Sequence, residues 1–321
     1  MKILANDGIS SAGKAKLEAY GFQVVTETID QANLAEGINA GGFVGILVRS
    51  ATKVRKEHID ACPNLKLIGR GGVGMDNIDV EYGRNKGLHV INTPSASSRS
   101  VAELAIGLLF SMSRFTYDAD RKMPVSGHND FKTLKKAYSK GTELRGKTLG
   151  IIGFGGIGKE LAKYALGCGM NVIYNTRSEK ETEQIKLTIA GQSIDVQVNK
   201  VSTEKLLAQS DYISLHVPKQ ADGSAVIGAN ELEKMKHGVG LINTSRGGSI
   251  DEDALIAALD AGKVKAAALD VFVGEPAPRE DVLSHPKIIS TPHIGGSTVE
   301  AQDRIGLELA DQIIAILGKQ N

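Results

Sequence analysis

The sequence predicts an α/β protein with two units, each built around a parallel β-sheet with helices between the strands. Short apolar runs alternate with helix-like stretches, glycines lie between them, and 321 residues suffice for two domains. The chain has 37 glycines, and those placed between apolar runs and helix-like stretches are typical of tight turns in such proteins. A hydrophobic content of 41% and the lack of a G-X-Y period exclude disordered and collagen-like chains.

The first unit is predicted from five short apolar runs. The expected strands are Ile3–Leu4, Phe22–Val25, Phe43–Val48, Leu65–Ile68 and Leu88–Ile91. Helix-like stretches with a polar face lie between them, for example Ser10–Tyr20 and Val54–Ala61. Because strands connected through helices usually pair in parallel, these residues predict a small parallel α/β unit.

The pattern changes after this unit. One wide apolar face predicts a helix over Val101–Phe115. The residues of that face are Leu104, Ala105, Leu108, Leu109 and Met112. The polar stretch that follows, Asp118–Lys140, has no strong period and is expected as an exposed loop or as an arm that contacts another subunit.

A second unit is predicted from Lys147 onward. Its expected strands are Lys147–Gly153, Asn171–Tyr174, Tyr212–His216, Gly240–Asn243, Lys265–Asp270 and Ile288–Ser290. Its expected helices, with one at the C-terminal end of the chain, are Ile157–Gly167, Glu204–Ser210, Asp251–Ala261 and Val299–Leu317. Six strands alternating with helices predict a doubly wound sheet. Apolar residues alternate on both sides of Gly191, so Ile185–Val198 is expected to be an inserted β-hairpin.

A glycine-rich turn predicts a dinucleotide site. Gly153-Phe154-Gly155-Gly156-Ile157-Gly158 matches G-x-G-x-x-G between an apolar strand and a helix. Gly153 permits the tight turn, Gly155 allows a pyrophosphate to approach, and Gly158 allows close helix–strand packing. The helix that starts near Gly156 offers unpaired N–H groups to the phosphates. A plain tight turn is the lesser alternative.

The adenosine end of this site is expected after the next strand. An acid is usual about 20 residues after the glycines, but Asn175-Thr176-Arg177 stand here. Asn175 does not repel a 2′-phosphate, and Arg177 can pair with one. Arg177 pointing into solvent is the equal alternative, so these residues leave NAD and NADP about equally possible.

Three polar residues follow strands of the second unit, namely Arg246, Glu275 and His293. Doubly wound folds bind ligands at this end of their strands. An Arg holds a carboxylate, a His exchanges a proton near neutral pH, and a Glu favours the charged imidazole. Each residue alone is more simply a surface or structural side chain, but their common placement predicts a catalytic group.

Charge and cysteine content limit the partners. The 38 Lys and Arg against 37 Asp and Glu leave a net charge of +1, without the basic stripe of a nucleic-acid or membrane-surface protein. No stretch approaches the roughly 20 apolar residues of a membrane span, and the N-terminus lacks a signal-peptide core. Cys62 and Cys168 form no disulfide framework, which suits a reducing cytoplasm, and no metal is required.

The order of these motifs resembles the D-isomer-specific 2-hydroxyacid dehydrogenase family over nearly the whole chain. Besides the glycine loop and the segments of Arg246, Glu275 and His293, the matching segments are Gly69–Asp79, Ser100–Leu104 and Leu215–Pro218. Within the family the chain is most similar to the phosphoglycerate dehydrogenases, in a short form. The segments behind that likeness are Leu47–Val54, Gly141–Leu144 and Gly295–Gln302.

The resemblance implies two Rossmann-like doubly wound domains. A discontinuous substrate domain would comprise residues 1–98 plus 293–321, and a dinucleotide-binding domain residues 99–292. A hinge would lie near Ser98–Ser100 and Thr291–Ser297, with substrate in the cleft. A homodimer would form through the helix and arm of residues 100–140.

The resemblance also implies roles for single residues. His293 would be the general acid and base, Glu275 would hold its imidazole, and Arg246 would bind the substrate carboxylate. Asp270 would orient the nicotinamide carboxamide. The remaining cofactor residues would be Gly156, Ile157, Thr176, His216, Val217, Thr244, Ser245, Gly295 and Gly296. The backbone N–H groups of Val73 and Gly74 would bind the substrate carboxylate. Its phosphate would be bound by Arg49, Ser50 and Arg70. Ser97 would also contact the substrate.

The implied reaction is NAD(P)-dependent oxidation of D-3-phosphoglycerate to 3-phosphohydroxypyruvate in serine biosynthesis. Two departures favour an NADPH-dependent glyoxylate or hydroxypyruvate reductase: Asn175 replaces the usual acid, and Ser97 stands where many phosphoglycerate dehydrogenases carry Asn. A non-catalytic dinucleotide-sensing scaffold is a third alternative, against which the intact Arg246, Glu275 and His293 argue. Because the chain stops at Asn321, the serine-sensing regulatory domain of longer relatives is expected to be absent.

Overall fold

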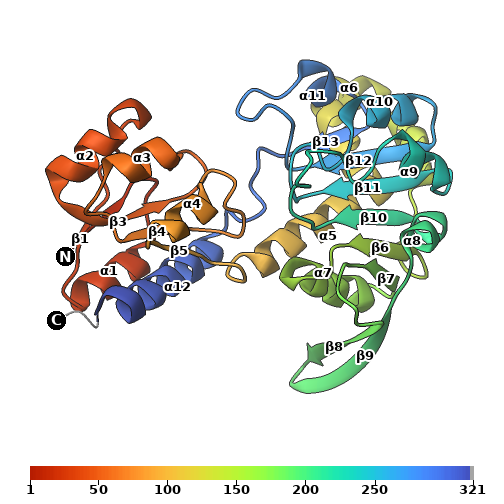
Figure 1. The fold of residues 1–321 in the computed structure, drawn as a ribbon. Coiled ribbons are helices and arrows are strands. Elements are labelled where there is room, and N and C mark those ends of the chain that lie inside the picture. The colour runs from red at the N-terminus through yellow and green to blue at the C-terminus, as the bar shows by residue number, and fades with distance from the viewer. Residues whose placement is uncertain (319–321) are drawn as a thin grey trace. The chain divides into compact units, whose positions relative to one another are not determined.

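A computed structural model describes residues 1–318, and the chain divides into two compact units. Unit 1 comprises Met1–Ser100 and Gly296–Asn321, and unit 2 comprises Val101–Gly295. Each unit contains one β-sheet with helices along it (Figure 1). The predicted α/β class is therefore confirmed. The assignment of substrate to one unit and dinucleotide to the other stays a prediction.

Unit 1 is built on five parallel strands in the order β2-β1-β3-β4-β5. The strands are β1 (Lys2–Ala5), β2 (Gln23–Val25), β3 (Phe43–Val48), β4 (Leu67–Arg70) and β5 (His89–Asn92). The helices are α1 (Ser11–Ala19), η1 (Gln31–Asn33), α2 (Leu34–Gly41), α3 (Lys56–Ala61), α4 (Val80–Asn85) and α12 (Val299–Leu317). Helices cover both faces of the sheet, since one core contains α1 and α12 and the other α2 and α3.

The helices α1 and α12 come from opposite ends of the chain and pack against each other (Figure 1). They approach closely, because a Cβ on Gly13 would lie only 2.6 Å from the backbone of Gly306. Leu309 and Ile313 of α12 share one core with Ile3 of β1. The last long helix therefore completes the hydrophobic core of the first sheet.

Unit 2 is built on eight strands in the order β13-β12-β11-β10-β6-β7-β9-β8. The strands are β6 (Thr148–Ile152), β7 (Asn171–Asn175), β8 (Thr182–Ile189), β9 (Gln192–Lys200), β10 (Tyr212–Leu215), β11 (Val239–Asn243), β12 (Val264–Leu269) and β13 (Ile288–Ser290). The helices are α6 (Thr116–Ala137), η2 (Tyr138–Lys140), α7 (Gly156–Gly167), α8 (Thr203–Gln209), α9 (Ala229–Lys234), α10 (Glu252–Asp260) and α11 (Glu280–Ser284), and most of α5 (Ser98–Arg114) also belongs here. The six predicted strands are present, and the order reverses between β6 and β10, where doubly wound sheets bind ligands.

The predicted hairpin is confirmed by the antiparallel pairing of β8 with β9. Gly191 has a φ of 80° in its turn. Ile185 and Val198 anchor its base at 2% exposure each, whereas Ile189 and Ile194 near the tip are 62% and 59% exposed. Strand β9 also pairs with β7, so the hairpin forms the edge of the sheet beyond β6 and β7. It extends away from the rest of the sheet (Figure 1).

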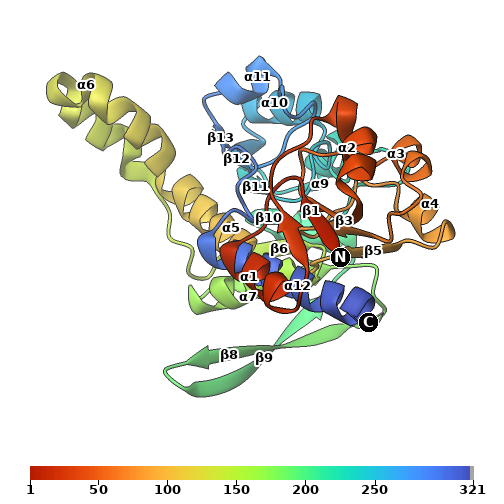
Figure 2. The same ribbon diagram turned by 90° about the vertical axis from the view of Figure 1, so that its left-hand side faces the viewer.

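The expectation of an exposed loop over Asp118–Lys140 is wrong, because most of this stretch is the helix α6. Phe115, with a φ of 56°, separates α5 from α6. Polar side chains interrupt the apolar spacing by which a helix is recognised in a sequence. Pro124, inside the helix, is a residue that usually ends one. Figure 2 shows α6 projecting from the sheet of its own unit. Within residues 1–318, no helix is both long and apolar enough to cross a membrane.

Candidate active site

The glycine loop between β6 and α7 is fixed by close backbone contacts. Gly153 has a φ of 93°, and a Cβ there would lie 2.3 Å from the carbonyl oxygen of His216. A Cβ on Gly158 would lie 2.4 Å from the oxygen of Gly153. At Gly155 a Cβ would meet nothing within 4 Å, and this residue precedes α7 without any side-chain cap. The first N–H groups of α7 are therefore open to an anion.

The strand β7 ends beside this loop. The carbonyl of Asn175 accepts a hydrogen bond from the Gly153 N–H at 2.9 Å, and its side-chain amide donates to the Val201 carbonyl at 2.9 Å. Thr176 is half-buried. Arg177 is exposed, and its side chain forms no hydrogen bond or ion pair within residues 1–318. The guanidinium is thus available to an anion, while the NAD or NADP preference stays open.

Two buried polar atoms lack a partner among residues 1–318 at positions expected to contact the dinucleotide. They are Nδ1 of His216 and Oγ1 of Thr244. The other ring nitrogen of His216 lies 2.9 Å from Oγ of Ser214. Because buried polar groups nearly always have partners, unpaired ones indicate a missing ligand or water. Together with the uncapped helix α7, they fit a nicotinamide dinucleotide.

Burial also lowers the pKa of His216 to about 3, so its imidazole is neutral at physiological pH. An unfolded histidine titrates near 6.5, so the unfolded chain alone gains this proton between about pH 6.5 and pH 3. His216 therefore lowers the stability as the pH falls through that window, by up to about 1.4 kcal/mol per pH unit. We expect the free energy of unfolding of His216→Asn to fall less steeply with decreasing pH than that of the wild type. Urea denaturation at a series of pH values measures it. The exposed His237→Asn is the control; identical slopes for wild type and His216→Asn would contradict the assignment.

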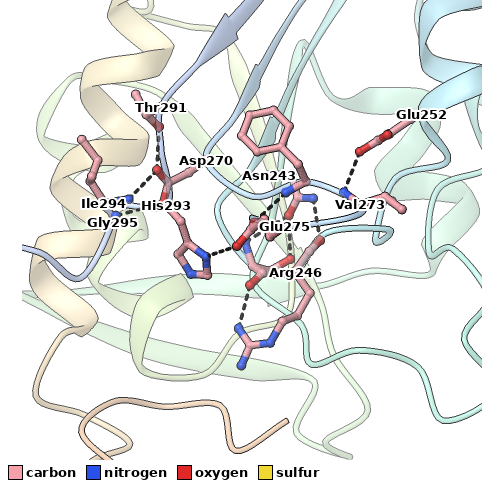
Figure 3. A network of polar contacts seen from close by, with 12 residues as sticks. Asn243, Arg246, Glu252, Asp270, Val273, Glu275, Thr291, His293, Ile294 and Gly295 are labelled. Carbon is pink, nitrogen blue, oxygen red and sulfur yellow. Dashed lines mark hydrogen bonds and ion pairs between the residues drawn. The ribbon is translucent and has the colours of Figure 1, made fainter. Parts of the chain in front are cut away.

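Glu275 and His293 form the centre of the candidate site (Figure 3). Nδ1 of His293 lies 2.8 Å from Oε2 of Glu275, whose Oε1 accepts the N–H of Phe272 at 2.8 Å. The His293 side chain is 46% exposed, and its Nε2 has no partner among residues 1–318. With Nδ1 donating to the carboxylate, Nε2 is left to exchange a proton with a ligand.

Asp270, at 1% exposure, fixes the turn that carries His293. Its carboxylate accepts hydrogen bonds from the Thr291 hydroxyl at 2.6 Å and from the N–H groups of Ile294 and Gly295, both at 2.8 Å. His293 itself has a φ of 53°, a conformation uncommon outside glycine. The sequence predicted Asp270 as a nicotinamide contact, and the structure shows its oxygens binding the turn around His293.

Arg246 is held by the residues that precede it. Asn243, 2% exposed, donates to the Arg246 carbonyl at 2.9 Å and accepts from the N–H and hydroxyl of Ser245 at 3.0 and 2.7 Å. A Cβ on Gly247 would lie 1.9 Å from the oxygen of Phe272, so the Arg246 loop directly contacts the Glu275 loop. The segments after β11, β12 and β13 thereby bring Arg246, Glu275 and His293 to one edge of the sheet (Figure 3).

Unit 1 contains a loop fixed around Arg49. The Asp7 carboxylate accepts the N–H groups of Arg49 and Thr52 at 2.6 and 3.1 Å, and the Asn77 amide donates to their carbonyls at 2.9 and 2.6 Å. Arg49 lines a pocket of about 240 Å³ together with Asp7, Ser10 and Gln302. Within residues 1–318 the Arg49 guanidinium has no hydrogen bond or ion pair.

The other predicted substrate residues also lie in unit 1. Ser50 is exposed and Ser97 is 6% exposed. Nη1 of Arg70 donates to the Gly71 carbonyl at 3.2 Å. The N–H groups of Val73 and Gly74 bind no acceptor within the described part of the chain. These N–H groups fit the expected carboxylate contact, which stays a prediction.

Sequence reasoning missed the residues that hold the site together. Asn243, Glu252 and Thr291 each bond to a segment that carries a predicted catalytic residue. The available signal was a polar residue at a strand end or helix start within a few positions of such a segment. Asn77, which holds the Arg49 loop, lies within the matching segment Gly69–Asp79 but was given no role, and Asp7 carried no comparable signal.

The fold and the site together define a class of protein. A doubly wound unit presents an open glycine loop and an Arg–Glu–His group at the carboxyl ends of its strands, which suits proton exchange beside a bound dinucleotide.

The comparisons with known proteins give the family. Residues 106–295 match the family described as D-isomer specific 2-hydroxyacid dehydrogenase, NAD binding domain. A hydroxypyruvate reductase of Thermotoga maritima is 46% identical over 276 residues, 85% of this chain and 84% of its own. A D-3-phosphoglycerate dehydrogenase of Archaeoglobus fulgidus is 39% identical over 98% of this chain, which spans 57% of that relative. The structure of a glyoxylate reductase from Paecilomyes thermophila has a TM-score of 0.82 at 32% identity, covering 99% and 96% of the two chains.

The chain therefore belongs to the D-isomer specific 2-hydroxyacid dehydrogenase family, as its motifs predicted. It is an oxidoreductase with an NAD-binding domain.

Proposed function

We propose that this protein interconverts D-3-phosphoglycerate and 3-phosphohydroxypyruvate. The observation that carries the proposal is the Arg49 guanidinium, which lines a pocket without any partner among residues 1–318 on a loop held by Asp7 and Asn77. Guanidinium and phosphate form bidentate, charge-assisted bonds. The Asp7 carboxylate does not bind the guanidinium, because its oxygens accept hydrogen bonds from the backbone N–H groups of Arg49 and Thr52 and from the Thr52 hydroxyl. The likeness to phosphoglycerate dehydrogenases supports the same substrate.

The reaction is a transfer of hydride and proton at C2 of the substrate. A nicotinamide dinucleotide held at the glycine loop would supply hydride chemistry at the keto carbon, in either direction. Arg246 binds the carboxylate and stabilises the charge that develops on the keto oxygen. Nε2 of His293 gives its proton to that oxygen, while Glu275 at Nδ1 orients the ring and stabilises the imidazolium. In the oxidative direction the same nitrogen takes the proton from the hydroxyl.

The dinucleotide is assigned to the open edge of unit 2. The N–H groups at the start of α7, from Gly156 and Ile157, would hold the pyrophosphate, and Thr244 and His216 would use their unpaired polar atoms. Arg177 carries no acidic partner within the described residues, which permits a 2′-phosphate at this end. Both NAD and NADP are therefore tested below.

The second candidate is reduction of hydroxypyruvate or glyoxylate. The 46% identical relative named hydroxypyruvate reductase favours it. Ser97, buried at 6% exposure, also favours it, because the expected phosphoglycerate dehydrogenase residue at this position is Asn. Both candidates use the same carboxylate and keto groups, and they differ in the phosphate that Arg49 would bind.

Arg49→Ala decides between the two candidates. We expect kcat/KM for 3-phosphohydroxypyruvate to fall about 10- to 100-fold, as for a lost charge-assisted contact of about 1.5–3 kcal/mol. The value for glyoxylate should change much less. Nicotinamide oxidation is measured with each substrate and with NADH and NADPH in parallel, and Arg84→Ala, an exposed arginine of the same unit, is the control. Equal losses for both substrates would remove Arg49 from a phosphate site, and a wild-type preference for glyoxylate would establish the second candidate.

We also propose that the chain acts as a homodimer through α5 and α6. The support is apolar side chains left exposed there, with Phe110 at 46%, Val125 at 85% and Phe131 at 56%. Exposed apolar residues gathered on two consecutive helices are typical of a protein interface.

A further inference from the structure

Glu252 is a buried carboxylate beside the candidate site. It is the first residue of α10 and is 8% exposed. Its Oε1 accepts the N–H of Val273 at 2.9 Å, and its Oε2 is buried without a hydrogen-bond partner among residues 1–318. Asp251 already caps α10 by accepting the N–H of Ala254 at 2.9 Å. The helix end therefore does not need Glu252 as its cap.

The bond from Glu252 is made to the loop that carries Glu275. Two consecutive N–H groups of that loop are taken by two carboxylates: Phe272 donates to Glu275 at 2.8 Å, and Val273 donates to Glu252 at 2.9 Å (Figure 3). Val273 is 47% exposed, so side-chain packing does little to hold it. The hydrogen bond that Val273 donates to Glu252 is therefore one restraint on this part of the loop, beside the close approach of Gly247 to Phe272.

The energetics argue against a purely structural purpose. A buried carboxylate with one hydrogen bond and one unpaired oxygen is costly, since desolvation is only partly compensated. A neutral side chain of similar size would serve stability as well. The charge strengthens the bond to Val273, because hydrogen bonds to ionised acceptors are stronger than neutral ones.

We propose that Glu252 is a positioning residue that fixes Glu275, and through it His293; this rests on the catalytic roles assigned under the proposed function. By holding Val273, Glu252 fixes the peptide plane next to Phe272. The Phe272 N–H then points at Oε1 of Glu275, which leaves Oε2 directed at Nδ1 of His293. Glu252 touches neither imidazole nor guanidinium in any contact that the structure gives.

The first experiment compares Glu252→Ala, Glu252→Gln and Glu231→Ala. Glu231 is the matched control, because its carboxylate also accepts one backbone N–H, that of Gly228 at 2.9 Å, away from the site. We expect Glu252→Ala to lower kcat about 10- to 100-fold, as for small displacements of catalytic groups. The pH profile of kcat should shift, while dinucleotide affinity stays within about twofold. Glu252→Gln keeps an oxygen acceptor but loses the charge that strengthens the bond, so its kcat should lie between those of the wild type and Glu252→Ala. Glu231→Ala should retain full activity.

A double-mutant cycle then tests the route through Glu275. Glu252→Ala combined with Glu275→Gln should be no slower than Glu275→Gln alone, because both changes remove the same orientation of His293. Losses that multiply would overturn the proposal, as would an unchanged kcat and pH profile in Glu252→Ala. If Glu252→Ala does not fold, Glu252→Asp is measured instead, because its shorter side chain keeps the charge but does not reach Val273. An unchanged kcat and pH profile in Glu252→Asp would overturn the proposal. If Glu275→Gln itself leaves turnover unchanged, the proposed function fails instead.

Discussion

Replacing His293 by asparagine is expected to lower turnover by about 10²- to 10⁴-fold, the usual contribution of general acid–base catalysis. His293 has its Nδ1 bound to Glu275 at 2.8 Å and its Nε2 free of any partner among residues 1–318. Asparagine removes the proton donor at Nε2, yet it tolerates the left-handed backbone that His293 adopts at a φ of 53°. The change therefore removes chemistry while leaving the turn intact.

Turnover and dinucleotide binding are measured on the same His293→Asn preparation. We expect the dissociation constant of the dinucleotide to change little, because Gly155, Thr244 and His216 lie outside the change. His237→Asn, an exposed histidine of the same unit, should match the wild type in both assays. Full residual turnover in His293→Asn would remove His293 from the role of acid, and loss of both turnover and dinucleotide binding would make it a binding residue instead.

Gly247→Ala is expected to abolish most turnover through the contact between two loops. The new Cβ would meet the carbonyl oxygen of Phe272 at 1.9 Å, which is backbone and cannot rotate away. The Arg246 loop and the Glu275 loop must therefore separate. A displacement of about 1 Å can cost about 100-fold in rate, and overpacking typically costs about 1–3 kcal/mol of stability. Both kcat and the free energy of unfolding are measured.

Gly167→Ala provides the matched control for this glycine. It lies at the end of α7, where a Cβ would meet nothing within 4 Å, so we expect unchanged turnover and equal or higher stability. A Gly247→Ala enzyme with wild-type kcat would show that the two loops need not touch for catalysis.

Much of the architecture followed from local patterns. The apolar runs predicted all five strands of unit 1 and six strands of unit 2, because strands buried on both faces are continuously apolar. The alternation around Gly191 predicted the hairpin β8–β9. Arg246, Glu275 and His293 were recognisable because each follows a strand that ends at the same edge of one sheet.

The supporting contacts could not be predicted, because they join positions far apart in the chain. Asp7 binds the N–H of Arg49, 42 residues away, and Glu252 binds that of Val273, 21 residues away. Nothing local distinguishes either carboxylate from a solvated one. The helix α6 was missed for a different reason: Pro124, Gly127 and many polar residues lie inside it, and these are residues typical of loops.

The packing of α12 on α1 has a consequence for synthesis on the ribosome. Strands β1 to β5 emerge first, but Leu309 and Ile313 of the last helix belong to the same core as Ile3. At about 5–20 residues per second, α12 is translated on the order of tens of seconds after β5. Unit 2 is complete in sequence before then, so unit 1, whose strands are made earlier than unit 2, acquires its full core after it. During that interval the first sheet lacks the helix that completes its core.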